Sequence, residues 1–258
     1  MKRFSKPARI VFAVIFWILV WEIAARAIDN VLLFPSPSAV LVALWGLLKT
    51  EQFYRITGTS LWNVLSGILF ALLLGGIWAT VTHCITLLRD LTVPLMTVVK
   101  ATPVASFIVL LMIFVGASRV PTLITFLIVL PVVWTNLDEG LRRRDPQLIE
   151  VARVYRFSAF KKLRYLTLPS IKPYFISACR TSLGLAWKAG IAAEIIANPR
   201  NSIGTMIGSA KQYLNTEEMF AWTLTVILLS LLIESGFVAL LNRFERKNVG
   251  RRRMTCSK

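Results

Sequence analysis

The chain is 258 residues long, 56% of its residues are hydrophobic, and its formal net charge at pH 7 is +17. Apolar runs of about 20 residues recur along it, and each can cross a hydrocarbon layer about 30 Å thick as a helix. This composition excludes an ordinary soluble domain. Because lipid offers the backbone no hydrogen-bond partners, we predict an all-α integral membrane protein that forms one domain over residues 1–258.

The cysteines and the one histidine give no sign of a metal or redox site. Cys84, Cys179 and Cys256 are scattered and form no CxxC or CxxH pattern, and His83 is alone. A single histidine near a helix end is more often a packed or interfacial residue than a catalyst. The sequence therefore predicts no disulfide framework, no metal centre and no cofactor.

The pattern predicts about six membrane spans, near residues 8–28, 61–83, 94–115, 121–137, 173–197 and 219–241. The first span begins basic and ends in Ala25-Arg26-Ala27, so it could also be a cleaved secretory signal. Its length, with Trp17 and Glu22, favours a retained anchor instead. Glu22 lies four residues before Arg26, the favourable order for a helical ion pair.

Lys and Arg are distributed very unevenly between the two sides that these spans define. Of the 30, 21 fall in segments on the side of the N-terminus and only five on the other side. Because cytoplasmic loops carry the excess of Lys and Arg, both termini are predicted to be cytoplasmic. The same asymmetry explains most of the net charge without a nucleic-acid partner.

Two outer loops, 29–60 and 198–218, are each expected to hold a short helix. Ser38 is expected to cap a helix over 39–48. In the second loop one apolar face, expected to lie at the outer surface or partly re-entrant, is formed by Ile203, Met206, Ile207, Ala210 and Leu214. Asn215 followed by Glu218 is typical of the cap of the last span.

Small residues and prolines mark packing and bending within the spans. Ala71 and Gly75 form a small-xxx-small pair that lets two helices approach closely. Pro103 and Pro131 lie inside the third and fourth spans, where proline allows a kink. Such kinks fit either ordinary bundle architecture or a hinge in a moving protein.

The cytoplasmic loop 138–172 combines basic charge with apolar side chains. Pro146 can begin a helix whose apolar stripe includes Leu148, Val151 and Val154, and a second short helix follows from Phe157. Pro169 and Pro173 are expected to stop and restart the helix. Charge alone would only fix topology, but an exposed apolar stripe indicates a docking partner.

The stretch "IEVARVYRFSAFKKLRYLTLPSIKP" resembles the EAA loop of bacterial ABC-importer permeases. Glu150, Ala152, Leu168 and Pro169 match its pattern, whereas Arg156 stands where the family has glycine. "LLFPSPSAV", "VPLMTVVKATPVASFIVLLMIFVG" and "AWKAGIAAEIIANPRNSIGTMIGSA" are similar to the nitrate, sulfonate and taurine branch. Glycine at that position permits a positive φ between two helices, and arginine there is unfavourable.

This resemblance implies a membrane-spanning subunit of an importer that carries a small anionic solute resembling a sulfonate, nitrate or taurine. Its implied partners are cytoplasmic ATP-binding subunits, an extracytoplasmic solute-binding protein and a second permease copy, with lipid around them. ATPase coupling falls on Glu150, Val151, Ala152, Tyr155, Arg156, Leu168 and Pro169. The loop is expected to move as a rigid lever on span five. The sequence has no G-x-x-x-x-G-K-[ST] motif, so we expect a non-catalytic chain.

Charged residues inside spans are the candidates for the translocation path, since they are costly in lipid. These are Lys100, Arg180, Lys188 and Glu194. Glu194 lies off the face shared by Arg180 and Lys188, and Glu234 could neutralise one of the cations. An anion path and structural ion pairs between helices both fit this pattern.

Two other functions remain open from the residues alone. A membrane-embedded lipid enzyme would need convergent acidic residues and histidine near an interface, and the loop offers acids without histidine. A secondary transporter driven by an ion gradient would show internal repeats, and we find no clear repeat. The solute also stays open among sulfonate, nitrate, taurine and a thiamine-precursor pyrimidine.

Overall fold

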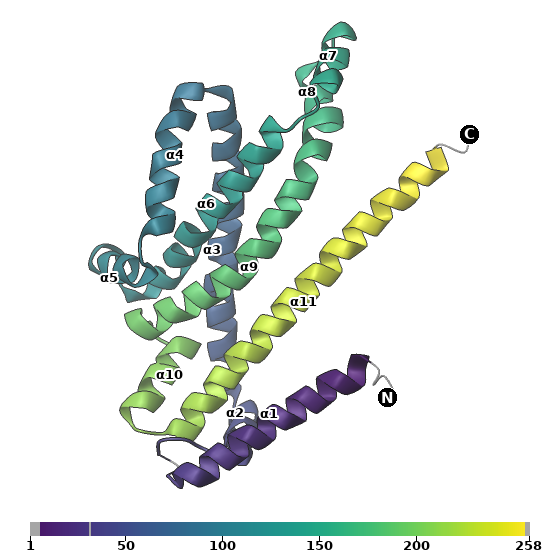
Figure 1. The fold of residues 1–258 in the computed structure, drawn as a ribbon. Coiled ribbons are helices and arrows are strands. Elements are labelled where there is room, and N and C mark those ends of the chain that lie inside the picture. Colours follow the sequence, from purple (N-terminus) through teal and green to yellow (C-terminus); the bar gives the residue numbers. More distant parts are fainter. Residues whose placement is uncertain (1–5, 31, 256–258) are drawn as a thin grey trace.

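The computed structural model describes residues 6–30 and 32–255, and these form helices joined by short turns, with no strand among them (Figure 1). Lys2, Arg3, Cys256 and Lys258 lie outside the described residues. The elements are α1 (Lys6–Ile28), α2 (Pro37–Leu48), α3 (Glu51–Cys84), α4 (Thr86–Ala101), α5 (Val104–Val115), η1 (Ala117–Arg119), α6 (Val120–Arg142), α7 (Pro146–Val154), α8 (Ala159–Lys162), η2 (Leu163–Thr167), α9 (Leu168–Ala197), α10 (Ile203–Gln212) and α11 (Thr216–Thr255).

The core is the packing of α6 between α3 and α9. A side chain at Gly67 of α3 would lie 2.6 Å from the carbonyl oxygen of Thr122, and one at Gly190 of α9 would lie 2.6 Å from Val64. Thr125 of α6 adjoins both glycines, so the three backbones meet at one crowded point. The predicted small-residue pair is confirmed, because Ala71 is buried and Gly75 packs on α6.

Within residues 6–30 and 32–255, four helices are long and apolar enough to cross a membrane: Arg9–Ile28, Glu51–Cys84, Ala117–Arg142 and Thr216–Phe237. α4 and α5 together make a fifth candidate. The all-α membrane fold is confirmed, whereas a count of six is not. α9, expected as a span over 173–197, is not among the candidates, and Arg180, Lys188 and Glu194 lie along it.

The region expected as one span over 94–115 begins earlier and is broken. α4 starts at Thr86, and α5 continues after a bend of 102°. The bend lies at Thr102 and Pro103, whose backbones are extended, with ψ of 131° and 130°. A residue before proline avoids the helical region, so the helix ends there. Pro131, by contrast, lies inside an unbroken α6.

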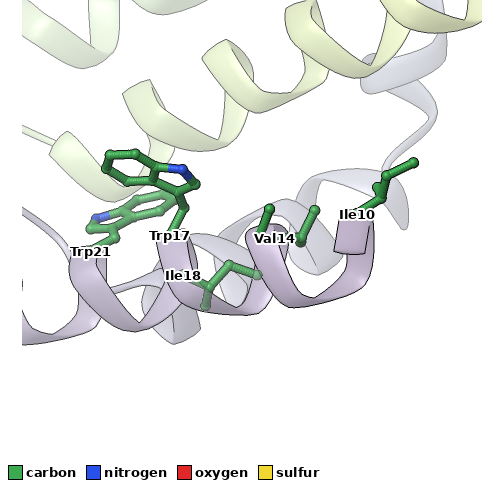
Figure 2. Close-up of a pocket in the computed structure, with 6 residues that line it drawn as sticks. Ile10, Val14, Trp17, Ile18 and Trp21 are labelled. Atoms are coloured by element: carbon green, nitrogen blue, oxygen red, sulfur yellow. The ribbon is translucent and has the colours of Figure 1, made fainter. Parts of the chain in front are cut away.

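The first helix is held mainly at its C-terminal end. The Trp21 indole donates to the carbonyl of Pro35 at 3.0 Å, and its ring packs on Phe34 and Phe220. Residues 9–20 of α1 are exposed, and the helix carries an open apolar groove bordered by Ile10, Ala13, Val14, Trp17, Ile18 and Trp21 (Figure 2). The predicted ion pair of Glu22 and Arg26 is confirmed at 2.8 Å.

At the end of the molecule formed by α2 and α10 (Figure 1), the structure differs from the sequence-based prediction in some details. The cap of α2 is Ser36 rather than Ser38, because Pro37 is the first helical residue and the cap must precede it. The apolar face of α10 packs against α9 and α11, with Ile203 and Ala210 buried, rather than lying on the membrane surface. Leu214 is instead exposed beyond the helix end, with a φ of 55°.

The cap of the last helix is confirmed. Asn215 accepts from the Glu218 amide at 3.2 Å and donates to the Glu218 carboxylate at 2.9 Å. α3, however, begins at Glu51, well before the expected residue 61. Thr50 caps it by accepting from the Phe53 amide. The predicted outer loop 29–60 therefore consists largely of helix.

Candidate functional site

The segment that resembles an EAA loop is a helical hairpin that projects beyond the ends of α6 and α9 (Figure 1). Asp145 caps α7 by accepting from the Gln147 amide, which leaves Pro146 at the first helical position. Large apolar side chains are exposed over the hairpin: Leu148, Val151, Val154, Tyr155, Phe160, Leu163, Tyr165 and Leu168. Glu150 is exposed beside them, whereas Ala152 is 2% exposed and packs inside.

The turn that follows α7 is a Schellman motif with an arginine at its left-handed position. The Phe157 amide donates to the Ala152 carbonyl at 2.9 Å, and the Arg156 amide donates to the Arg153 carbonyl at 3.0 Å. Arg156 has a φ of 46°. Glycine is the usual residue at this position of the motif. The positive φ that glycine permits at this position is therefore present, although the residue is an arginine.

The second half of the hairpin runs into α9 without a stop. The expectation that Pro169 and Pro173 interrupt the helix is wrong: α8, the π-helical segment η2 and α9 form one continuous helical path. The Leu168 amide donates to the Leu163 carbonyl, one residue further back than in an α-helix. This wider turn lies directly before Pro169, whose ring would crowd the preceding α-helical turn.

Polar contacts that sequence reasoning missed tie the base of the hairpin to other helices. Arg144 donates to the Leu141 carbonyl at 2.8 Å and to Thr167 at 3.4 Å, and it contacts the His83 ring of α3. Arg89 of α4 forms a bidentate ion pair with Asp138 of α6, at 3.1 Å and 3.2 Å. We name these residues, Arg89, Asp138, Arg144, Thr167 and His83, the neck clamp. These partners lie far apart in the sequence, so the sequence alone does not show that they are in contact.

The cationic path candidates lie on two different helices. Lys100 is at the end of α4 and donates to Thr135 of α6 at 2.7 Å. Arg180 and Lys188 lie eight residues apart on α9, and both are exposed. Gly184 between them has nothing within 4 Å of where its Cβ would lie, so that face of the helix is open. Glu234, proposed as a partner, is exposed on α11.

Glu194 lies in a different environment, at the α10 end of the core. It is fully buried, and its carboxyl accepts from Ser60 at 2.7 Å, from Asn63 at 3.3 Å and from the Gly204 amide at 3.2 Å. Ser60 also accepts from the Ile203 amide at 2.9 Å. The group thus joins α3 and α9 to the first turn of α10.

Comparison with known proteins agrees with this architecture. The chain is 27% identical to the aliphatic sulfonates transport permease SsuC of Bacillus subtilis over 88% of this chain and 82% of that protein. It is 27% identical to the taurine transport permease TauC of Escherichia coli (86% and 83%) and 28% identical to the riboflavin transport permease RibX of Chloroflexus aurantiacus (95% and 93%).

A solved structure shows the same fold. It is the crystal structure of an amino acid ABC transporter, matched with a TM-score of 0.62 and 16% identity over 79% of this chain and 97% of that one. The family model for the binding-protein-dependent transport system inner membrane component matches residues 67–248, well over half of the chain. The chain therefore belongs to this family of multi-pass membrane permeases and is the permease subunit of an ABC importer.

Proposed function

We propose that the hairpin over 146–168 is the docking surface for a cytoplasmic ATP-binding subunit. The observation that carries this proposal is the exposure of its apolar side chains at the end of the fold, with Val154 at 73% and Tyr155 at 72%. Lipid cannot cover them if the hairpin end lies beyond the membrane, so a protein partner must. The basic residues gathered around the hairpin support a cytoplasmic position for this end.

The docking proposal is tested by co-purification of the chain with its ATP-binding subunit. Val154→Asp places a charge among the exposed apolar side chains and should abolish capture of the subunit. Tyr213→Asp is the matched control, since Tyr213 is also exposed, at 83%, but lies at the opposite end. Equal capture by the wild type and Val154→Asp would refute the proposal. Ala152→Asp is a weaker test, because this buried site supports the hairpin itself.

We propose further that the path carries a small anionic solute and is completed by a second permease copy. Lys188 is exposed on α9, a helix that packs along the candidate span α6. A lysine that faces lipid is unfavourable, so a second chain covering this face of α9 would remove that cost. Lys188 and Arg180 would then provide positive charge along the path, and a separate binding protein would deliver the solute.

Uptake by reconstituted vesicles tests the solute class. Lys188→Gln should reduce the initial rates of taurine and ethanesulfonate uptake, while Lys211→Gln on α10, which removes the same charge elsewhere, should not. Riboflavin serves as the bulkier comparison solute, given the RibX relative. Unchanged uptake of both sulfonates by Lys188→Gln would exclude its role in the path.

A further inference from the structure

We infer that Arg144 is a positioning residue that makes the hairpin, α3, α6 and α9 move as one body when the ATP-binding subunit moves the hairpin. This inference rests on the proposed docking function. It adds how a movement of the hairpin is transmitted to the helices of the core. Without contacts that hold its base to these helices, the projecting hairpin could bend at its base while α3, α6 and α9 kept their positions.

The position of Arg144 at the base of the hairpin is the first observation. Arg144 immediately precedes Asp145, the cap of α7, and Thr167 immediately precedes Leu168, the first residue of α9. The contact of the guanidinium with Thr167 therefore closes the base of the hairpin across 23 residues of sequence. Its bond to the Leu141 carbonyl fixes the same side chain to the last turn of α6.

The contact with α3 is the second observation. The Arg144 guanidinium meets the His83 ring, one residue before the end of α3 and 61 residues away in sequence. A guanidinium is planar and carries five donors in a fixed fork, so one side chain can hold three partners in a set geometry. The hairpin base is thereby attached to α3, α6 and α9 together.

The Arg89–Asp138 pair extends this attachment to α4. The Asp138 side chain is 8% exposed and that of Arg89 is 25% exposed, and the two are paired in bidentate fashion. Asp138 lies six residues before Arg144, within the last two turns of α6. Separating the two would leave the largely buried Asp138 carboxylate without its partner, which is costly, so α4 is expected to follow α6 rather than slide past it.

Neighbouring arginines show that charge alone does not explain Arg144. Arg142, Arg143 and Arg144 carry the same charge and equal weight in membrane topology. Arg142 and Arg143 are exposed, and Arg143 pairs with Glu139 one turn back and also interacts with Tyr174 of α9. Of these three, Arg144 is the one that contacts α3. Arg143 therefore provides a control that matches Arg144 in charge, size and place but lacks the contact with α3.

The test measures the distance between hairpin and α3 in the complete complex. Spin labels are placed at Lys161→Cys on α8 and Ile77→Cys on α3, both exposed sites, in a background without native cysteines. The complex in lipid nanodiscs is measured without nucleotide and with ATP and vanadate. In the wild type and in Arg143→Met, the label distance should stay constant between the two states. In Arg144→Met it should shift or broaden, with capture of the ATP-binding subunit retained.

Conservative variants show whether the effect of Arg144 comes from its bonding geometry, from its charge or from a loss of folding. Arg144→Lys keeps the charge but not the fork, and should behave like Arg144→Met. His83→Gln keeps an acceptor for Arg144 and should resemble the wild type, whereas His83→Leu should show the broadened distance. Size-exclusion profiles matching the wild type establish that each variant is folded.

The outcomes distinguish this inference from the docking proposal. An unchanged, narrow distance in Arg144→Met, with the ATP-binding subunit bound, would overturn the inference and leave docking intact. If Val154→Asp still captures the subunit, the docking proposal fails instead. If Arg143→Met broadens the distance as much as Arg144→Met, the effect is one of charge, and the positioning role is refuted.

Discussion

Replacing Glu194 by alanine removes an acceptor that three groups share in the interior of the α10 end. Ser60 and the Gly204 amide, both buried, lose their bond to the same carboxyl oxygen, at 2.7 Å and 3.2 Å, and Asn63 loses one at 3.3 Å. A buried polar group left without its partner costs about 1–3 kcal/mol. Counting only the two fully buried donors, we expect Glu194→Ala to lower the free energy of unfolding by about 2–6 kcal/mol.

Glu194→Gln sharpens this prediction because it keeps the shape and one oxygen. The amide oxygen of glutamine can still accept from Ser60 and Gly204, so the expected loss is about 1–2 kcal/mol. Glu234→Ala is the control, since Glu234 is exposed on α11 and a surface change of this kind is worth about 0.5 kcal/mol or less.

Two measurements on the purified protein check the Glu194 prediction. Denaturant unfolding in detergent micelles, followed by tryptophan fluorescence, gives the loss of stability, since Trp187 and Trp222 are buried. Hydrogen exchange of the Ile203 and Gly204 amides reports the first turn of α10 directly. If Glu194→Ala costs no more than Glu234→Ala and both amides stay protected, the network does not hold α10 in place.

Three further changes test the packing and the turns. Arg156→Gly should relieve the left-handed backbone, with its φ of 46°, and stabilise the hairpin by about 1 kcal/mol, seen as slower hydrogen exchange of α7 amides. Gly67→Ala should cost about 2 kcal/mol or more in denaturant unfolding, since its Cβ would lie 2.6 Å from a carbonyl oxygen. Gly58→Ala in the same helix, with nothing within 4 Å, should be neutral or stabilising, and equal effects at both glycines would contradict the packing. Asp138→Ala removes the partner of Arg89, whose side chain is 25% exposed and can be hydrated instead, so it should cost about 1–2 kcal/mol, and an unfolding midpoint like that of the wild type would show the pair to be dispensable.

Helix spacing rules predict correctly those features that depend on residues three or four apart in the sequence. The Asn215–Glu218 cap, the Glu22–Arg26 pair and the Ala71–Gly75 contact surface all follow from spacings of three or four residues. The exposed apolar stripe of the hairpin follows from helical periodicity for the same reason. Such patterns are visible in sequence because one helix turn brings the residues together.

The neck clamp could not be predicted, because its partners come from different helices. Arg144 and His83 are 61 residues apart, and Arg89 and Asp138 are 49 residues apart. The sequence shows each as a charge near a membrane boundary, where topology alone accounts for it. The sequence likewise presents Glu194 only as a charged residue among the candidates for the translocation path. Its partners Ser60 and Gly204 come from α3 and α10, and how these helices meet is not visible in the sequence.

The beginnings of α2 and α3 differ from the prediction, although the sequence contains the residues that mark them. Pro37 is favoured at the first helical position, which makes Ser36 rather than Ser38 the cap. Polar residues over 51–60 masked the early start of α3, although Thr50 followed by Glu51 and Phe53 fits a helix beginning there. Pro169 by itself does not reveal whether the helix stops there or widens into a π turn, and the structure shows the π turn.

The crowded meeting of α3, α6 and α9 at Gly67, Thr125 and Gly190 has a mechanical consequence. Because these backbones approach so closely, we expect the three helices to tilt about this crossing as one unit. Against the second copy proposed above, a tilt that brings the two hairpin ends together would separate the two α10 ends, which is the reciprocal opening that a gated passage needs.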